Sequence, residues 1–206
     1  MIGVASHPDR TERERHPLAR TRLLVVDDHP AVRAGLRELL AHESDFELVA
    51  AVATAEAGIS VAEREPIDLA VIDYQLGGRN GLWLSRKLKR LPEPPAVLIY
   101  SAYADGVLAA AAVVAEADAI VSKGTLGTDL CQAVRNAASG RRDLPPLSPR
   151  LAESLRCRLD HKQQAIFGLL LAGIEPADAA ETLGLSPADL ESQLWLMLQR
   201  LEGLPG

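Results

Sequence analysis

The chain has 206 residues, of which 48% are hydrophobic and 3% are aromatic, as is typical of a globular protein with one large domain or two modest ones. Its formal net charge of −6 gives the whole molecule no electrostatic attraction for nucleic acid or an anionic membrane. Two cysteines, Cys131 and Cys157, are too few and too far apart for a disulfide framework or a metal site, so we expect a reducing, cytoplasmic location.

The N-terminal segment is predicted to be a disordered tail over residues 1–20. Its mixture of Arg, Glu, His and Pro cannot bury enough apolar surface to order itself, and residues 10–22 are too charged for an export signal. No stretch of the sequence is long and apolar enough to cross a bilayer, so no membrane partner is expected.

Residues 21–140 alternate short apolar runs with segments of helical periodicity. The apolar runs predict strands at 23–26, 46–53, 67–72, 96–100 and 119–121. The periodic segments predict helices starting at Pro30 and at 55–65, 82–91, 105–117 and 128–139. This alternation predicts an α/β fold with a doubly wound, five-stranded parallel sheet.

A second, smaller all-α domain is predicted over residues 151–206. Residues 141–150 are rich in Arg, Pro and Ser and are predicted to be a linker that proline stiffens locally. Beyond this linker, the pattern predicts helices at 151–159, 161–172, 176–183 and 187–202.

Polar residues follow the predicted strands, each at its carboxyl end. Asp27 and Asp28 close the first strand, Asp73 the third, Ser101 the fourth and Lys123 the fifth. Because the carboxyl ends of parallel strands meet at one edge of the sheet, we expect these groups to converge. Three carboxylates brought together repel one another, and a hard cation with oxygen ligands, such as Mg²⁺, would relieve that repulsion.

The predicted cluster has the groups that phosphoryl transfer requires. The carboxylate of Asp73 is able to attack a phosphoryl group and form an acyl phosphate. The cation and Lys123 would neutralise the transferred oxygens, and Ser101 would offer a hydroxyl to one of them. Each residue alone has an ordinary explanation as a helix cap, a turn former or a surface group. Their order on successive strand ends favours a joint site.

Four segments resemble the receiver domain of two-component response regulators. They are LLVVDDHP at 23–30, DYQLGGRNG at 73–81, YSAY at 100–103 and VSKG at 121–124. The DDHP motif is similar to that of the NarL/LuxR-type subfamily. The resemblance spans the predicted receiver at 21–140 and implies a flavodoxin-like fold.

The resemblance also implies a role for each residue of the cluster. Asp73 would be the phosphoacceptor. Asp28 would bind Mg²⁺ directly, Asp27 would bind it mostly through water, and the backbone carbonyl of Gln75 would be a further ligand. A second set would contact the phosphoryl group, with Ser101 as the switch hydroxyl and Lys123 as its cation. The partner would be a sensor histidine kinase or another phosphodonor.

Two positions depart from the family pattern. Gly77 stands four residues beyond the phosphoacceptor, where the family usually has proline. Ile120 stands three residues before the lysine, where an aromatic switch residue is common, and Tyr100 or Tyr103 is a candidate substitute. The resemblance therefore predicts phosphorylation of the domain more directly than the conformational change that would follow it.

Residues 159–202 resemble the LuxR-type helix-turn-helix domain, with AETLGLS at 180–186 close to the corner between the two helices. The charge of this segment is unusual for a DNA-binding domain, because seven carboxylates face only two cations, Lys162 and Arg200, for a net charge of −5. The presumed recognition helix offers a candidate output surface of acidic, polar and aromatic residues. These are Asp189, Glu191, Ser192, Gln193 and Trp195.

The apolar run from Leu194 to Met197 spans more than one helical face. At least one of its side chains should therefore lie away from the core of its own domain. Such a side chain usually marks a partner surface, and the candidates are a protein partner, a homodimer contact or the docked receiver.

Three functional classes follow. The first is a transcription regulator whose phosphorylation promotes dimerisation and DNA binding. The second is an atypical response regulator whose acidic helix-turn-helix domain acts through protein contacts. The third, a phosphatase resembling the haloacid dehalogenases, is disfavoured because those enzymes place the nucleophile after the first strand with a second Asp two residues on. We therefore expect no enzyme, and DNA and protein remain the alternative output partners.

Overall fold

The computed structural model describes residues 20–202, without the side chain of Glu202. Apart from Arg20, the predicted disordered tail lies outside the described residues. Within the described range, no helix combines the length and the hydropathy that spanning a bilayer requires.

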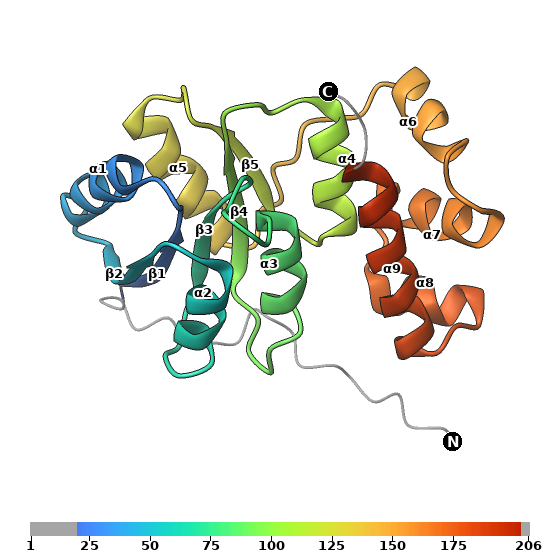
Figure 1. Ribbon diagram of the computed structural model, residues 1–206, viewed down its shortest axis with the longest axis horizontal. Coiled ribbons are helices and arrows are strands. Elements are labelled where there is room, and N and C mark those ends of the chain that lie inside the picture. Colours follow the sequence, from blue (N-terminus) through green and yellow to red (C-terminus); the bar gives the residue numbers. More distant parts are fainter. Residues whose placement is uncertain (1–19, 203–206) are drawn as a thin grey trace.

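The N-terminal half is built on a five-stranded parallel sheet in the order β2-β1-β3-β4-β5 (Figure 1). The strands are β1 (Thr21–Val26), β2 (Phe46–Val52), β3 (Leu69–Asp73), β4 (Ala96–Ser101) and β5 (Ala119–Ser122). The crossover helices are α1 (Pro30–Ala41), α2 (Ala55–Ala62), α3 (Gly81–Leu88), α4 (Gly106–Val114) and α5 (Gly127–Ala138). The predicted fold class, a doubly wound parallel sheet, is confirmed.

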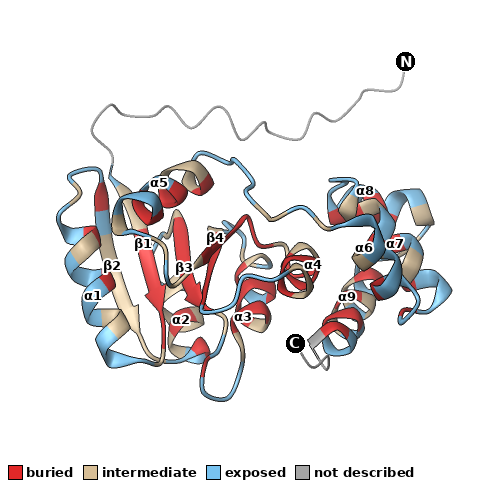
Figure 2. Ribbon diagram, turned by 90° about the horizontal axis from the view of Figure 1, so that it is seen from above, coloured by how far each residue is buried: buried red, intermediate tan, exposed pale blue. Residues whose placement is uncertain are grey.

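Helices cover both faces of the sheet, with α1 and α5 on one side and α2, α3 and α4 on the other (Figure 2). Alternate residues of β1 serve the two faces, since Leu23 and Val25 pack with α1 and α5 whereas Leu24 and Val26 pack with α2, α3 and α4. Double coverage explains why the strand is a continuous apolar run, without the alternation of a sheet that faces water on one side.

Some element ends differ from the prediction. The fourth crossover helix was expected over 105–117, but α4 ends at Val114 because Glu116 takes a left-handed backbone with φ +59°. The third crossover helix was expected over 82–91 and ends at Leu88. The third strand begins at Leu69 and includes Asp73, which therefore lies at the carboxyl edge within the strand.

The C-terminal half is helical, with α6 (Pro149–Arg156), α7 (His161–Leu171), α8 (Pro176–Leu183) and α9 (Pro187–Glu202). Gly184 closes α8 with φ +63°, the left-handed conformation that glycine adopts without strain, and α9 begins three residues later.

The segment between the two halves adheres to the sheet. Asp143 forms a parallel bridge with Ala119 at the outer edge of β5, and its carbonyl accepts a hydrogen bond from the Ile120 N–H at 3.2 Å. Helix α6 begins at Pro149, inside the predicted linker at 141–150, and the Ser148 side chain caps it. The linker is thus partly an extension of the sheet and partly helix.

The two halves pack against each other. Helix α4 contacts α6, α7 and α9, and both views show α9 alongside α4 (Figures 1 and 2). One continuous apolar cluster includes side chains of the sheet, α4 and the C-terminal helices, among them Leu108 of α4 and Leu194 and Leu198 of α9. The C-terminal half therefore shares its core with the sheet-containing half.

Candidate functional site

The candidate site lies at the carboxyl edge of the sheet, where β1 and β3 are neighbours. Asp27 follows the last residue of β1 and is 1% exposed, and Asp73 ends β3 and is 3% exposed. Asp28 is half-buried, at the rim of the same edge. The carboxylates converge because parallel strands direct their carboxyl ends to one side.

Lys123, which follows β5, reaches across the edge to both buried carboxylates. Its Nζ donates a hydrogen bond to Asp27 Oδ2 at 2.8 Å and lies 2.7 Å from Asp73 Oδ2. The lysine thus links three strand ends and supplies positive charge to the two buried acids.

Burial and charge change the proton affinity of these groups. Burial raises the pKa of the Asp73 carboxyl, the Lys123 contact opposes that shift, and the nearby charge of Asp27 adds to it. Burial alone would lower the pKa of Lys123, but its contacts with Asp27 and Asp73 raise that pKa overall. Lys123 is therefore held in its charged form beside the acids.

The loop after β3 wraps around the acids through its backbone. The N–H of Gln75 donates to Asp73 Oδ1 at 3.2 Å, and the N–H of Gly77 donates to Asp28 Oδ2 at 3.1 Å. The second bond gives a physical role to the departure at position 77, because proline has no N–H to donate there. The role of the Gln75 carbonyl as a metal ligand stays a prediction.

His29 also lies at the site, although it was not among the predicted site residues. The Nδ1 atom of His29 lies 2.6 Å from Asp28 Oδ1, 3.4 Å from Asp27 Oδ1 and 3.7 Å from Asp73 Oδ2. The available signal was its place directly after the acid pair, at the turn that leads into α1.

The donor set fits a hard divalent cation. Ligand atoms of Asp27, Asp28, His29 and Asp73 all lie within 4.8 Å of one another, and three of the four are carboxylate oxygens. Oxygen donors at such spacing suit Mg²⁺, which binds through a few carboxylates and keeps part of its water shell. The cluster could therefore hold a metal ion.

Ser101 is at the predicted edge, but its hydroxyl is engaged locally. The side chain is buried, its Oγ donates to the carbonyl of Tyr103 at 2.9 Å, and the Tyr103 N–H donates back at 3.2 Å. Tyr103 is 73% exposed, whereas Tyr100 is buried with its hydroxyl 3.5 Å from the Lys123 carbonyl. Two tyrosines were candidates to replace the switch aromatic. Tyr103 is exposed to solvent, and Tyr100 is buried.

The candidate output residues of α9 point in different directions. Asp189 accepts a hydrogen bond from Ser186 at 2.7 Å, and Gln193 accepts one from Gln163 at 3.1 Å, within the helical domain. The Ser192 hydroxyl donates to the Ala188 carbonyl of its own helix at 2.9 Å.

Glu191 and Trp195 face the sheet-containing half of the chain. Arg90 Nε donates to Glu191 Oε2 at 2.7 Å, and the Trp195 ring centroid lies 6.4 Å from that of Trp83. Of the partners expected for the apolar run of α9, the structure therefore shows the docked receiver.

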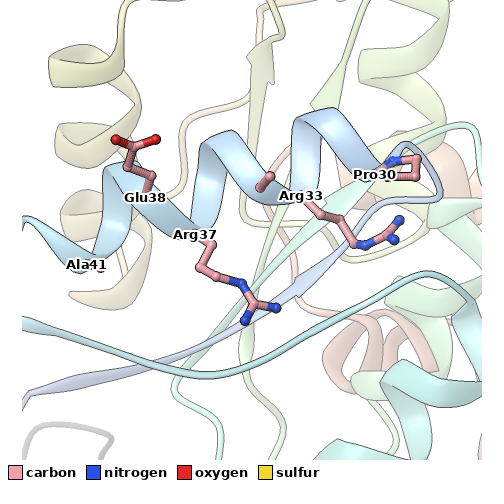
Figure 3. A pocket seen from close by; sticks show the side chains of 6 residues that line it. Pro30, Arg33, Arg37, Glu38 and Ala41 are labelled. Atoms are coloured by element: carbon pink, nitrogen blue, oxygen red, sulfur yellow. The ribbon is translucent and has the colours of Figure 1, made fainter.

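A shallow depression along α1 is separate from the acidic cluster. It is lined by Pro30, Arg33, Ala34, Arg37, Glu38 and Ala41. Figure 3 shows Arg33 and Arg37 projecting from one side of α1 and Glu38 from the other. Arg33 Nη1 donates to the Asp27 carbonyl at 2.6 Å, so α1 is tied to the backbone of the site.

A five-stranded parallel sheet with buried acids at the carboxyl ends of β1 and β3 and a lysine after β5 is the arrangement expected of a receiver domain. The family described as "Response regulator receiver domain" matches residues 23–135, and the chain belongs to this family.

Relatives extend the similarity beyond the receiver. The chain is 25% identical over 189 residues to the response regulator UvrY of Escherichia coli K12, covering 87% of each chain. It is 27% identical over 191 residues to the nitrate/nitrite response regulator NarL of the same strain, covering 87% of this chain and 88% of NarL. Among solved structures, a LuxR-family response regulator from Aurantimonas sp. SI85-9A1 has a TM-score of 0.58 and 29% identity, covering 66% of this chain and 94% of that one.

Proposed function

We propose that the protein is a response regulator that a sensor histidine kinase, or another phosphodonor, modifies on Asp73. The observation that supports this most directly is the 2.7 Å contact of Lys123 with Asp73 Oδ2, beside the buried Asp27. Membership of the receiver family gives the class of protein. The contact of Lys123 with Asp73 supports Asp73 as the residue that is modified.

In the proposed reaction, a carboxylate oxygen of Asp73 attacks the phosphorus of a phosphohistidine. The new O–P bond makes an acyl phosphate and the P–N bond breaks, so the donor nitrogen keeps the electron pair and takes a proton from solvent. Lys123 neutralises charge on the transferred oxygens, and the N–H groups of Gln75 and Gly77 hold the loop against the carboxylates of Asp73 and Asp28.

The proposed cation would be held by Asp28 and Asp73, with Asp27 close by, and His29 at the rim. Mg²⁺ supplies charge neutralisation and orientation of the phosphoryl oxygens when bound. The chain's own groups would bind and orient the phosphoryl group. Lys123 contacts Asp27, and the Gln75 N–H contacts Asp73.

Asp73→Asn tests the phosphoacceptor assignment. Wild-type protein incubated with Mg²⁺ and acetyl phosphate should gain one phosphoryl group in intact-mass spectra, and the variant should gain none. Asp129→Asn, an exposed position on α5, makes the same charge change and should be modified like the wild type. Equal modification of the Asp73→Asn protein would overturn the assignment.

For the output, we propose transcription control through the C-terminal domain, with two modes in competition. Direct DNA binding is the mode of a helix-turn-helix. The acidic segment and the docking of Glu191 and Trp195 on the receiver favour the second mode, in which the domain acts through protein contacts.

A low-salt mobility-shift titration with the beryllofluoride-bound protein separates the two output modes. Sequence-selective retardation of DNA would support the first mode. Unretarded DNA at protein concentrations that saturate beryllofluoride binding would support the second.

A further inference from the structure

Helix α4 has no polar face. Its sequence, GVLAAAAVV, holds no polar or charged side chain, and its central residues from Leu108 to Ala112 are all buried. A helix that is apolar all round requires cover on every side. The receiver core covers one side, and α6, α7 and α9 lie against the other (Figure 2). The receiver is therefore built to remain covered by the C-terminal domain.

A buried cation joins the same two halves. Arg86 of α3 is 0% exposed, and its guanidinium forms ion pairs with Glu116 of the receiver and with Glu191 of α9. Burial lowers the pKa of Arg86 to about 10, and the two carboxylates oppose this shift. Withdrawal of α9 would leave this arginine with half of its countercharge.

The backbone at Glu116 is strained in a way that serves this contact. Its φ of +59° is a left-handed conformation that side chains other than glycine adopt at a cost. It directs the carboxylate between two arginines, Arg86 and Arg90, and Arg90 Nη2 lies 2.6 Å from Glu116 and 2.6 Å from Glu191. Two cations and two anions thus alternate across the junction.

An aromatic pair extends the junction. The rings of Trp83 on α3 and Trp195 on α9 are 6.4 Å apart at an interplanar angle of 46°. The Lys87 ammonium lies 5.6 Å from each ring centroid, within cation–π range of both. The surfaces of α3 and α9 are therefore complementary here, with aromatic rings on both helices and a cation on α3 that lies near both rings.

We propose that the interface of α9 with the receiver is permanent and stays closed when Asp73 is modified. It is made by Trp83 and Arg86 of α3, by Arg90 after α3 and Glu116 after α4, and by Glu191 and Trp195 of α9. DNA-reading side chains lie toward the N-terminal part of the second helix of a helix-turn-helix, which is where Glu191 stands. The interface makes this side of α9 inaccessible to DNA. The two domains would therefore act as one rigid unit. The inference deepens the second output mode and rests on the proposed modification of Asp73.

Hydrogen exchange of the full chain tests the proposal in three states: without ligand, with Mg²⁺, and with Mg²⁺ and beryllofluoride. We expect beryllofluoride to slow exchange in the loops after β3 and β4, which reports occupancy of the site. Exchange in α4 and α9 should change by less than about twofold. Acceleration of roughly tenfold or more in α9 would mean that the interface opens and would overturn the proposal.

A variant that removes the charge of Glu191 tests the interface independently of the acidic site around Asp73. Glu191→Gln, without ligand, should accelerate exchange of α3, α4 and α9 together by roughly tenfold. Glu181→Gln is the matched control, since it removes the same charge from an exposed position on α8. If the two variants behave alike, the ion pairs do not hold α9 and the proposal is wrong. Should beryllofluoride leave every loop unchanged while Glu191→Gln acts as expected, the closed interface stands and the proposed phosphoacceptor function fails.

Discussion

A β-carbon on Gly81 would lie 2.3 Å from the backbone carbonyl oxygen of Asp73. The first residue of α3 is thus in close contact with the end of β3, and the Gly81 N–H donates to the Tyr74 carbonyl at 2.8 Å to close the loop between them. The loop that surrounds the candidate phosphoacceptor depends on the absence of a side chain at this position.

Gly81→Ala should therefore destabilise the protein by about 1–3 kcal/mol, because the added methyl group must displace backbone at the site. Gly35→Ala is the control, since a β-carbon there meets nothing within 4 Å. In the middle of α1 it should stabilise by about 0.5–1 kcal/mol through helix propensity. Urea unfolding of both variants measures the difference, and an equal effect of the two changes would contradict the steric argument.

Lys123→Met should destabilise the ion-free protein at neutral pH by about 3 kcal/mol, because Asp27 and Asp73 lose their shared cation in a buried setting. A bound divalent cation replaces part of that charge, so Mg²⁺ should raise the Tm of the variant more than that of the wild type. Thermal unfolding with and without Mg²⁺ measures this. Lys162→Met, at an exposed position on α7, should show no such dependence.

Asp28→Ala should weaken Mg²⁺ binding by at least roughly tenfold, since the variant loses the most accessible carboxylate of the cluster. Calorimetric titration with Mg²⁺ is the measurement. Glu38→Gln, on the exposed side of α1, should bind as the wild type does. Wild-type affinity in the Asp28→Ala protein would remove Asp28 from the ligand set.

Arg135 on α5 forms an ion pair with Asp45, the residue before β2. The Arg135 Nε donates a hydrogen bond to Asp45 Oδ2 at 2.8 Å. This hydrogen bond lowers the pKa of Asp45 below its ordinary 3.8. The carboxylate therefore contributes stability above pH 3.8 and loses it as pH falls through the lowered pKa.

Asp45→Asn should cost about 0.5 kcal/mol at neutral pH, because the pair is solvent-exposed and screened. The difference from wild type should shrink to zero as pH falls through the lowered Asp45 pKa. Unfolding by urea across this pH range measures it. A difference that stays constant with pH would assign the effect to packing, with the charge playing no part.

The sheet and the acidic edge were predictable because their signals are local. The apolar run at 23–26 is buried on both faces, and the groups that end β1 and β3 meet by the geometry of parallel strands. The early end of α4 was not predictable, since the left-handed backbone at Glu116 accompanies an ion pair with Arg86, 30 residues away.

The interface itself was hidden for a similar reason. An arginine in a helix is normally a solvated residue, and Arg86 is a core residue because Glu116, 30 residues later, and Glu191, 105 residues later, both approach it. The apolar run of α9 did predict a partner surface, but spacing within one helix cannot identify the surface it meets. His29 was missed because an imidazole after an acid pair has no distinctive periodicity.

The bridge between Asp143 and Ala119 has a consequence for the receiver as a separate fragment. β5 is an outer strand, and an uncovered outer strand offers free N–H and C=O groups to any other extended chain. Residues beyond α5 shield part of that strand, and the helices beyond them shield the apolar surface of α4. Truncation of the chain after α5 would remove both shields at once, and the severed domain would be prone to self-association and precipitation.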